Sequence, residues 1–191
     1  MSDEMTDLLT EKVDGVAWLR LNRPDKHNAV TYEMWQAIAF AIENFATDES
    51  VRVIVVTGEG GRAFSSGADI SQFEKQRASS NATEIYNKAV KEALTALTNT
   101  TKPTIAQIQG YCLGGGVGIA LGCDIRIASE DACFSIPAAR LGLAYGFEAL
   151  RHLTDIVGPA HAKEILFTAR RYTVSEAYDM GLVNRVVSSN D

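Results

Sequence analysis

The apolar positions along the chain recur with two different periods, and each period predicts one type of secondary structure. Short continuous apolar runs over 51–57 and 104–108 are typical of buried strands. Apolar residues at helical spacing predict a helix over 83–99. A similar stripe predicts another helix that begins after Thr31, a residue type favoured at helix N-termini. Strands that alternate with helices are typical of an α/β protein.

Turn and capping signals complete this pattern. An Asp-Gly pair at 14–15, which favours a tight hairpin, separates apolar runs over 8–13 and 16–21 and predicts two paired strands. Thr173, followed by Glu176, predicts a capping box at the start of a helix. Further short strands are expected at 125–128, 133–136 and 182–187, and further helices at 115–122, 146–157 and 159–168. We therefore expect an α/β fold with a layered or spiral sheet.

Length, composition and charge narrow the class of protein. The chain has 191 residues, of which 46% are hydrophobic, so it can bury one full core, and we expect a single domain over 1–191. The net charge of −6 and the lack of a block rich in Lys or Arg argue against a nucleic-acid surface. No apolar run approaches the roughly 20 residues of a membrane span, and the polar N-terminus lacks the features of a signal peptide. We therefore expect a cytoplasmic protein that binds neither nucleic acid nor membrane.

The cysteines and a neighbouring pair of charged residues are interpreted as structural. Cys112, Cys123 and Cys133 are an odd number, and they have neither CxxC spacing nor a cluster of histidines nearby. This pattern argues against structural disulfides and zinc, and we expect buried apolar thiols. Asp124 and Arg126 are expected to form a structural ion pair.

Two glycine-rich segments each follow a predicted strand. The first covers 58–70, and the second covers 110–116 and opens a helix of small residues. Backbone N–H groups at such a helix N-terminus are free to bind an anion or a developing oxyanion. Alternatively, the glycines only allow the helix to pack closely on a strand. The first segment formally fits a dinucleotide-binding pattern, but it does not lead straight into a helix, so NAD is not expected.

Three motifs resemble those of one enzyme family. Phe-Ser-Ser-Gly-Ala-Asp-Ile at 64–70, together with Gly-Tyr-Cys-Leu-Gly-Gly-Gly at 110–116, resembles the paired signature of the crotonase, or enoyl-CoA hydratase/isomerase, superfamily, and Arg-Pro-Asp-Lys-His-Asn-Ala at 23–29 matches a third motif. The resemblance implies the crotonase fold, a spiral of strand-strand-helix units. It also implies a homotrimer or hexamer when a helical C-terminal segment is present. Because the sequence stops at Asp191, we expect it to lack that trimerisation segment.

The resemblance implies enolate chemistry on a coenzyme A thioester, with coenzyme A carried by the substrate and no separate cofactor or metal ion. The family polarises the thioester carbonyl with two backbone N–H groups, and the matching residues here are Ala68 and Gly115. The turn at 66–70 is similar to the segment whose backbone meets the adenine. Lys26 lies in the loop that flanks the phosphates, although it is equally consistent with a solvated surface charge. The residues expected to bind the acyl-CoA substrate are Lys26, Ser66, Ala68, Asp69, Ile70 and Gly115.

The acid/base residues depart from the best-known branch of the family. Hydratases place two carboxylates over the alkene of the substrate, and the matching positions here are Gly118 and Ala138, so both carboxylates are missing. The segment 136–145 is instead similar to the methylmalonyl-CoA decarboxylase branch, in which a tyrosine after Leu-Gly lies at the active site. Tyr145 is the matching residue, although that branch places a histidine where this chain has Ala68. A packing role for Tyr145 is equally consistent with the sequence.

Three functions stay open at this point. The first is an enoyl-CoA hydratase/isomerase-like enzyme, a lyase or isomerase, that stabilises a thioester enolate with the two N–H donors and Tyr145 as its catalytic groups. The second is a decarboxylase of a malonyl-type CoA thioester, which needs no base because loss of carbon dioxide creates the enolate. The third is a non-catalytic acyl-CoA-binding or assembly protein. Weaker acid/base candidates are Asp69 and Glu148, and the polar stretch over 71–81 is expected to be a mobile loop or frayed helix that covers the substrate.

Overall fold

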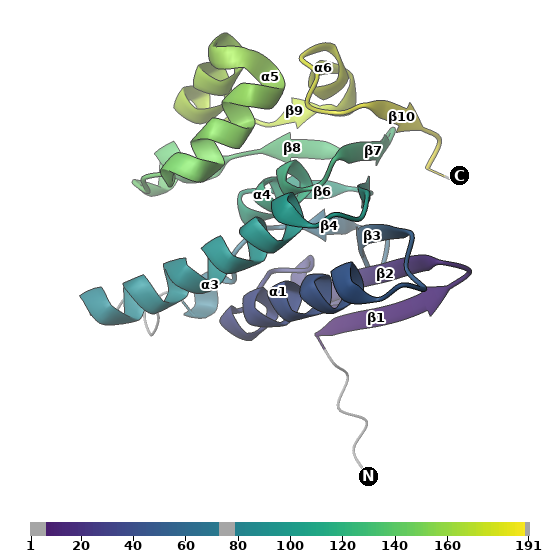
Figure 1. Cartoon of the computed structure of the whole chain (residues 1–191). Helices are drawn as coiled ribbons and strands as arrows, with labels where there is room; N and C mark the ends of the chain where they lie inside the picture. The colour runs from purple at the N-terminus through teal and green to yellow at the C-terminus, as the bar shows by residue number, and fades with distance from the viewer. Residues whose placement is uncertain (1–6, 73–78, 190–191) are drawn as a thin grey trace.

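The computed structural model describes residues 7–72 and 79–189, which form two sheets and their flanking helices (Figure 1). One sheet has six strands in the order β1-β2-β3-β5-β7-β10, and the other has four in the order β4-β6-β8-β9. The strands of the larger sheet, in that order, are Leu8–Val13, Val16–Leu21, Val53–Gly58, Thr104–Ile108, Ile125–Ser129 and Arg185–Val187. Those of the smaller sheet are Ala63–Ser65, Tyr111–Leu113, Cys133–Ser135 and Tyr172–Thr173.

The helices lie between and beside these strands in the chain. They are α1 Tyr32–Thr47, α3 Ser80–Asn99, α4 Gly115–Gly122, α5 Phe147–Thr168 and α6 Val174–Asp179, with short 3-10 helices η1 Pro24–Lys26, η2 Ile70–Gln72 and η3 Pro137–Leu141. Figure 1 shows β1 and β2 at one end of the molecule and α5, α6, β9 and β10 at the other. The N-terminal elements therefore lie at one end of the molecule and the C-terminal elements at the other, and the strands of the larger sheet follow one another in chain order.

The first two strands form the expected hairpin. β1 pairs antiparallel with β2, and Val13 lies opposite Val16. Asp14 and Gly15 between them have φ values of 52° and 84°, which are the positive values that a tight two-residue hairpin turn needs. The hairpin prediction is therefore confirmed, including the bounds of both strands.

The helix α1 supplies much of the core against the larger sheet. It begins where expected, because the Thr31 side-chain oxygen accepts a hydrogen bond from the Met34 N–H at 3.2 Å. The apolar stripe that predicted this helix is buried and consists of Met34, Trp35, Ile38, Ile42 and Phe45. The helix α3 packs against α1 and begins at Ser80, earlier than expected, because Ser79 caps it by accepting the Ala82 N–H at 3.1 Å.

The strand-strand-helix order implied by the family resemblance repeats along the chain. β3, β5 and β7 of the larger sheet are each followed by a short strand of the smaller sheet and then by a helix, which can be followed in Figure 1. β4, β6 and β9 were not predicted from the sequence, and they are only two or three residues long. Such short strands are too brief for an alternating pattern to be visible in the sequence.

The C-terminal part follows its local signals. α5 is interrupted at Gly158, whose φ of 75° is not helical, and Pro159 follows, so the expected break between two helical stretches is confirmed. The capping box is also present. The Thr173 hydroxyl accepts the Glu176 N–H at 3.3 Å, and the Glu176 carboxylate accepts the Thr173 N–H at 2.8 Å.

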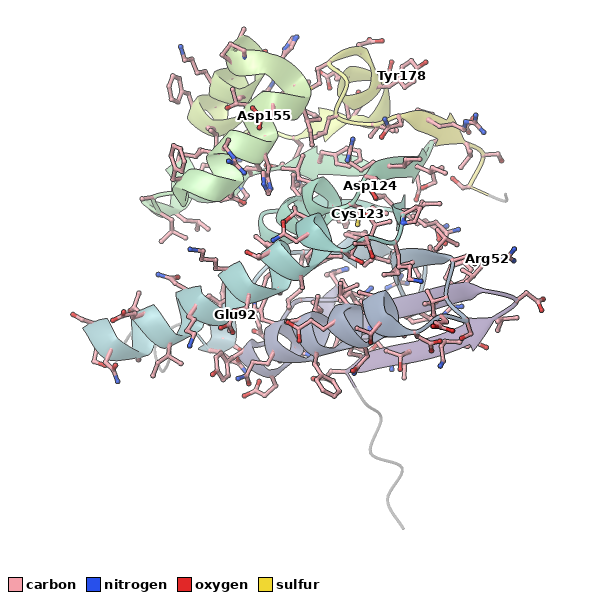
Figure 2. All side chains as sticks on the ribbon, viewed as in Figure 1. Arg52, Glu92, Cys123, Asp124, Asp155 and Tyr178 are labelled. Carbon is pink, nitrogen blue, oxygen red and sulfur yellow. The ribbon has the colours of Figure 1, made fainter. Side chains whose placement is uncertain are left out.

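The expected ion pair between Asp124 and Arg126 is wrong. Asp124, which follows the end of α4 (Figure 2), accepts hydrogen bonds from the N–H and the hydroxyl of Thr104, both at 2.8 Å. Arg126 is 5% exposed and donates to the carbonyl oxygens of Leu182 and Cys123 at 2.8 and 2.7 Å. Burial lowers the pKa of Arg126. The buried guanidinium is thus held by backbone carbonyl groups, which tie β7 to the segment before β10.

The cysteines lie largely inside the fold, as expected. Cys112 and Cys123 are buried free thiols, and burial raises the pKa of both, while Cys133 is partly exposed. Within residues 7–72 and 79–189, no group of His, Cys, Asp and Glu side chains is arranged to hold a metal ion. The helices of that same part of the chain include none that is long and apolar enough to cross a membrane.

Candidate active site

The two glycine-rich turns, which follow β4 and β6 of the smaller sheet, approach each other closely. A Cβ atom added to Gly67 would lie 2.9 Å from the Gly115 nitrogen and 2.8 Å from the Leu113 carbonyl oxygen, so only glycine allows this approach. Gly67 also has a φ of 92°, which disfavours other residues. On the opposite side, the Cβ position of Gly115 lies 3.4 Å from the Ala68 nitrogen. The structure therefore brings together Ala68 and Gly115, the two residues that were expected from the sequence to supply backbone donors.

The Ala68 N–H points away from the segment that anchors it. The Val30 N–H donates to the Gly67 carbonyl oxygen at 2.8 Å, and the Asp69 N–H donates to the Val30 carbonyl oxygen at 3.0 Å. The Gly67 carbonyl and the Ala68 N–H belong to one trans peptide, so they point in opposite directions. Among the described residues, no acceptor binds the Ala68 N–H. It is therefore free to bind a ligand.

The Gly115 N–H is arranged in the same way. Gly115 is the first residue of α4, and the carbonyl oxygen of its peptide, that of Gly114, accepts the Gly118 N–H at 3.2 Å and the Tyr145 hydroxyl at 3.0 Å. The N–H therefore points away from both donors. It too lacks an acceptor in the part of the chain that the structure describes. The positive end of the α4 dipole lies at this position.

A buried asparagine holds the first turn in place. Asn28 is fully buried, and its side-chain amide donates to the carbonyl oxygens of Glu59 and Ala63 at 2.9 and 2.7 Å. Its side-chain oxygen accepts the Arg23 N–H at 2.9 Å. The Ser65 hydroxyl donates to the Asn28 carbonyl oxygen at 2.8 Å. Asn28 is part of the motif at 23–29, but its structural role was not predicted from the sequence, although asparagine is enriched at positive φ, which is 53° here.

Asp69 fastens the same turn. Its carboxylate accepts the Arg23 guanidinium at 2.8 Å and the N–H and hydroxyl of Ser71 at 3.0 and 2.6 Å. Burial alone would raise the pKa of Asp69, but the hydrogen bonds from Ser71 and Arg23 outweigh it, so the pKa is lowered. A carboxylate that stays ionised and is fully hydrogen-bonded suits a structural role better than that of a proton donor.

The remaining residues expected to bind substrate lie at the exposed rim of the first turn. The Ser66 hydroxyl donates to the Lys26 carbonyl oxygen at 3.4 Å, and the Ser66 N–H donates to the His27 carbonyl oxygen at 2.9 Å. The Lys26 side chain is exposed, and Ile70 is 70% exposed. Residues 73–78 of the expected substrate cover lie outside the described residues.

Neither of the two positions that match the carboxylates of hydratases, Gly118 and Ala138, carries an acid/base group. Gly118 lies on α4, and a Cβ atom there would meet only the Leu94 side chain, at 3.8 Å. Ala138 lies on η3 and is buried. The Tyr145 hydroxyl donates to a backbone carbonyl, and burial raises its pKa. The side chain of Glu148, the other candidate here, lies outside the described part of the structure.

The strand-strand-helix spiral, with two glycine turns that face each other, defines a crotonase-like protein. The model of the enoyl-CoA hydratase/isomerase family matches residues 11–191. The chain belongs to the enoyl-CoA hydratase/isomerase family.

Relatives with different activities are similar to this chain. A short-chain-enoyl-CoA hydratase from Clostridium acetobutylicum is 35% identical over 189 residues, which cover 98% of this chain and 71% of the relative. A peroxisomal Δ(3,5)-Δ(2,4)-dienoyl-CoA isomerase from Arabidopsis thaliana is 38% identical over 181 residues, which cover 90% of this chain and 65% of the relative. The crystal structure of an enoyl-CoA hydratase/carnitine racemase from Magnetospirillum magneticum matches with a TM-score of 0.94 at 34% identity, over 98% of this chain and 70% of that one.

Proposed function

We propose that this protein is an acyl-CoA enzyme that stabilises the enolate of a thioester with the N–H groups of Ala68 and Gly115. The observation that carries the proposal is the pair of free N–H groups on facing turns, each with the carbonyl of its own peptide held on the opposite side. The names of the Clostridium and Arabidopsis relatives both refer to CoA esters, which supports this substrate class.

The chemistry follows from where the negative charge develops. When a base removes a proton from the carbon next to the thioester, or carbon dioxide is lost from that carbon, the electron pair of the broken bond stays behind and its negative charge is shared with the thioester oxygen. Two fixed N–H donors aimed at that oxygen stabilise the enolate more than the ground state. The dipole of α4 adds to this effect at Gly115. At the exposed rim, Ser66 and Ile70 would meet the adenine of coenzyme A, and Lys26 would face its phosphates.

The acid/base groups decide which reaction is carried out. Gly118 and Ala138 supply no carboxylate, and each missing proton-transfer group typically costs about 100- to 10,000-fold in rate. Decarboxylation of a malonyl-type CoA thioester is therefore the second candidate, because loss of carbon dioxide creates the enolate without a base. The missing carboxylates favour it. A binding-only protein is the third.

One experiment separates these functions. The full chain is incubated with crotonyl-CoA, a 3-enoyl-CoA and methylmalonyl-CoA in deuterated water, and the thioesters are followed by mass spectrometry. We expect addition of water or deuterium exchange with a double-bond shift. Loss of carbon dioxide would select the decarboxylase, and binding without conversion would favour the binding protein. If calorimetry detects no saturable binding of any of the three thioesters, the proposal fails.

A variant that removes one donor sharpens this test. Proline lacks an N–H and is well accepted at the first helical position, so Gly115→Pro deletes the second donor while α4 can still form. We expect turnover to fall by about 100- to 1,000-fold. The Cβ position of Gly115 is 3.2 Å from the Trp35 ring, so thermal unfolding is measured on the same variant to show that the fold is kept. Unchanged turnover in a folded variant would contradict the role of Gly115.

A further inference from the structure

The Tyr145 hydroxyl contacts the peptide between Gly114 and Gly115 on the side opposite the Gly115 N–H. It donates to the Gly114 carbonyl oxygen at 3.0 Å, and the Gly115 N–H of the same peptide points the opposite way. We propose that Tyr145 is a positioning residue that holds this peptide so that the Gly115 N–H faces the substrate. The inference rests on the proposed function of that N–H.

The peptide between Gly114 and Gly115 needs to be held because its neighbours hardly restrict it. Gly114 has φ of 50° and ψ of −114°, a conformation that residues with a side chain rarely adopt. Glycines on both sides of the peptide leave its plane free to rotate at low cost. A rotation by half a turn would replace the N–H with a carbonyl oxygen. That oxygen would repel an enolate instead of stabilising it.

Two donors hold the Gly114 carbonyl, and they differ in kind. The Gly118 N–H, at 3.2 Å, closes the first turn of α4, and the Tyr145 hydroxyl, at 3.0 Å, binds from outside the helix. A carbonyl oxygen accepts two hydrogen bonds, so both sites are filled. Hydrogen bonds to a carbonyl also polarise its peptide and strengthen the N–H as a donor. Tyr145 is thus expected to affect both the direction and the strength of the Gly115 N–H.

Tyr145 is well placed to keep this bond. Its side chain is partly buried against the core, in the connection between η3 and α5. Burial raises its pKa, so the hydroxyl stays protonated and able to donate at any ordinary assay pH. While its proton is given to Gly114, the same hydroxyl cannot donate to a substrate carboxylate. This geometry separates a positioning role from the direct catalytic role considered for Tyr145 in a decarboxylase.

The test uses the thioester carbonyl as a probe of the donor pair. Butyryl-CoA, which has no double bond to hydrate or shift, is labelled with ¹³C at the carbonyl and bound to wild-type protein, Tyr145→Phe and Tyr178→Phe, and the carbonyl shift and the Kd are measured. Tyr178 is 52% exposed on α6 (Figure 2), so Tyr178→Phe is a matched control. We expect Tyr145→Phe to lose part of the downfield shift while its Kd changes by less than about threefold. Tyr178→Phe keeps the full shift.

The outcomes distinguish the role of Tyr145 from the proposed acyl-CoA function on which it rests. If wild-type protein binds no acyl-CoA, both the proposed function and the role of Tyr145 are overturned. If wild-type protein binds with a downfield shift and Tyr145→Phe shows the same shift, only the role of Tyr145 is overturned.

A second measurement covers the case in which Tyr145→Phe does not fold. Replacement of Tyr145 by 3-fluorotyrosine keeps the ring and hydroxyl but makes the O–H a stronger donor. We expect the carbonyl shift to move further downfield than in wild-type protein. A shift equal to that of wild-type protein would contradict the positioning role, because a residue that only packs would not transmit the change.

Discussion

The two turns that face each other at the site present the same chemical group, but they are held by different means. The first turn, 65–70, is fastened by polar side chains, above all Asn28, Asp69 and Arg23. The second turn, 113–116, is held by backbone hydrogen bonds and by its close approach to the first turn and β4. The Tyr145 side chain adds a hydrogen bond to the Gly114 carbonyl oxygen. The first turn should therefore be sensitive to the loss of polar side chains, and the second turn to an atom added at Gly116.

Removal of Asn28 should have the largest effect on stability. Asn28→Ala deletes three side-chain hydrogen bonds, one buried and two part-buried, and leaves their backbone groups without these partners, at about 1 kcal/mol for each. Alanine at φ of 53° adds about 1 kcal/mol of strain, so the total is about 4 kcal/mol. Urea unfolding measures it. Asn28→Gly should lose about 1 kcal/mol less because glycine accepts that φ, and exposed Asn87→Ala serves as the neutral control.

If Asn28→Ala were as stable as Asn87→Ala, the first turn would not depend on its side chains, and the contrast between the two turns would disappear. The same variant also tests function. Loosening of the turn should weaken acyl-CoA binding, which calorimetry measures under conditions where the variant is still folded.

An added methyl group should break the second turn. A Cβ atom on Gly116 would lie 2.5 Å from the Ser65 carbonyl oxygen, so Gly116→Ala must push α4 away from β4, which we expect to cost about 2–3 kcal/mol. Gly118→Ala, two residues along the same helix, is the matched control because its nearest neighbour is the Leu94 side chain at 3.8 Å. It should gain up to about 1 kcal/mol from helix propensity. Equal unfolding free energies for the two variants would contradict the close-packing argument.

Features could be predicted from the sequence where they depend on neighbouring residues, but not where they depend on contacts between distant residues. The hairpin at 14–15, the Thr31 cap and the α4 helix were found because their signals lie within a few neighbouring residues. The role of Asn28 and the true partners of Arg126 were missed because they depend on residues far away in the chain.

The candidate site was predictable only in part for the same reason. The residues Ala68 and Gly115 were named from motifs, and each motif is local. The direction in which each N–H points depends instead on a bond to the preceding carbonyl from a distant residue, Val30 in one case and Tyr145 in the other. Such partners leave no periodic pattern in the sequence, and they become visible only once the chain is folded.

Asp69 should give the first turn a dependence on pH that the second turn lacks. Because its pKa in the folded protein is lowered, its carboxylate stabilises the fold above its unfolded pKa of about 3.9, and this contribution is lost as the pH falls through the folded pKa. Asp69→Asn should cost about 1–2 kcal/mol at pH 7 and less at pH 3. Unfolding free energies at both pH values measure this. Exposed Asp25→Asn is the control, and a cost for Asp69→Asn that does not shrink at pH 3 would contradict the role of the ionised carboxylate.

Removal of the Lys26 charge, at the rim of the first turn, should have the smallest effect, and this effect on acyl-CoA binding should depend most clearly on salt. Lys26 is exposed, so its attraction to a phosphate of coenzyme A is screened by water and ions. We expect Lys26→Ala to weaken acyl-CoA binding by about threefold at low salt and hardly at all at high salt, whereas exposed Lys163→Ala on α5 should change neither value. An effect equal at both salt concentrations would mean that Lys26 acts by packing. No effect at either would make it a solvated surface charge, and the first turn would then contribute its N–H and its shape but no charge to the binding of the substrate.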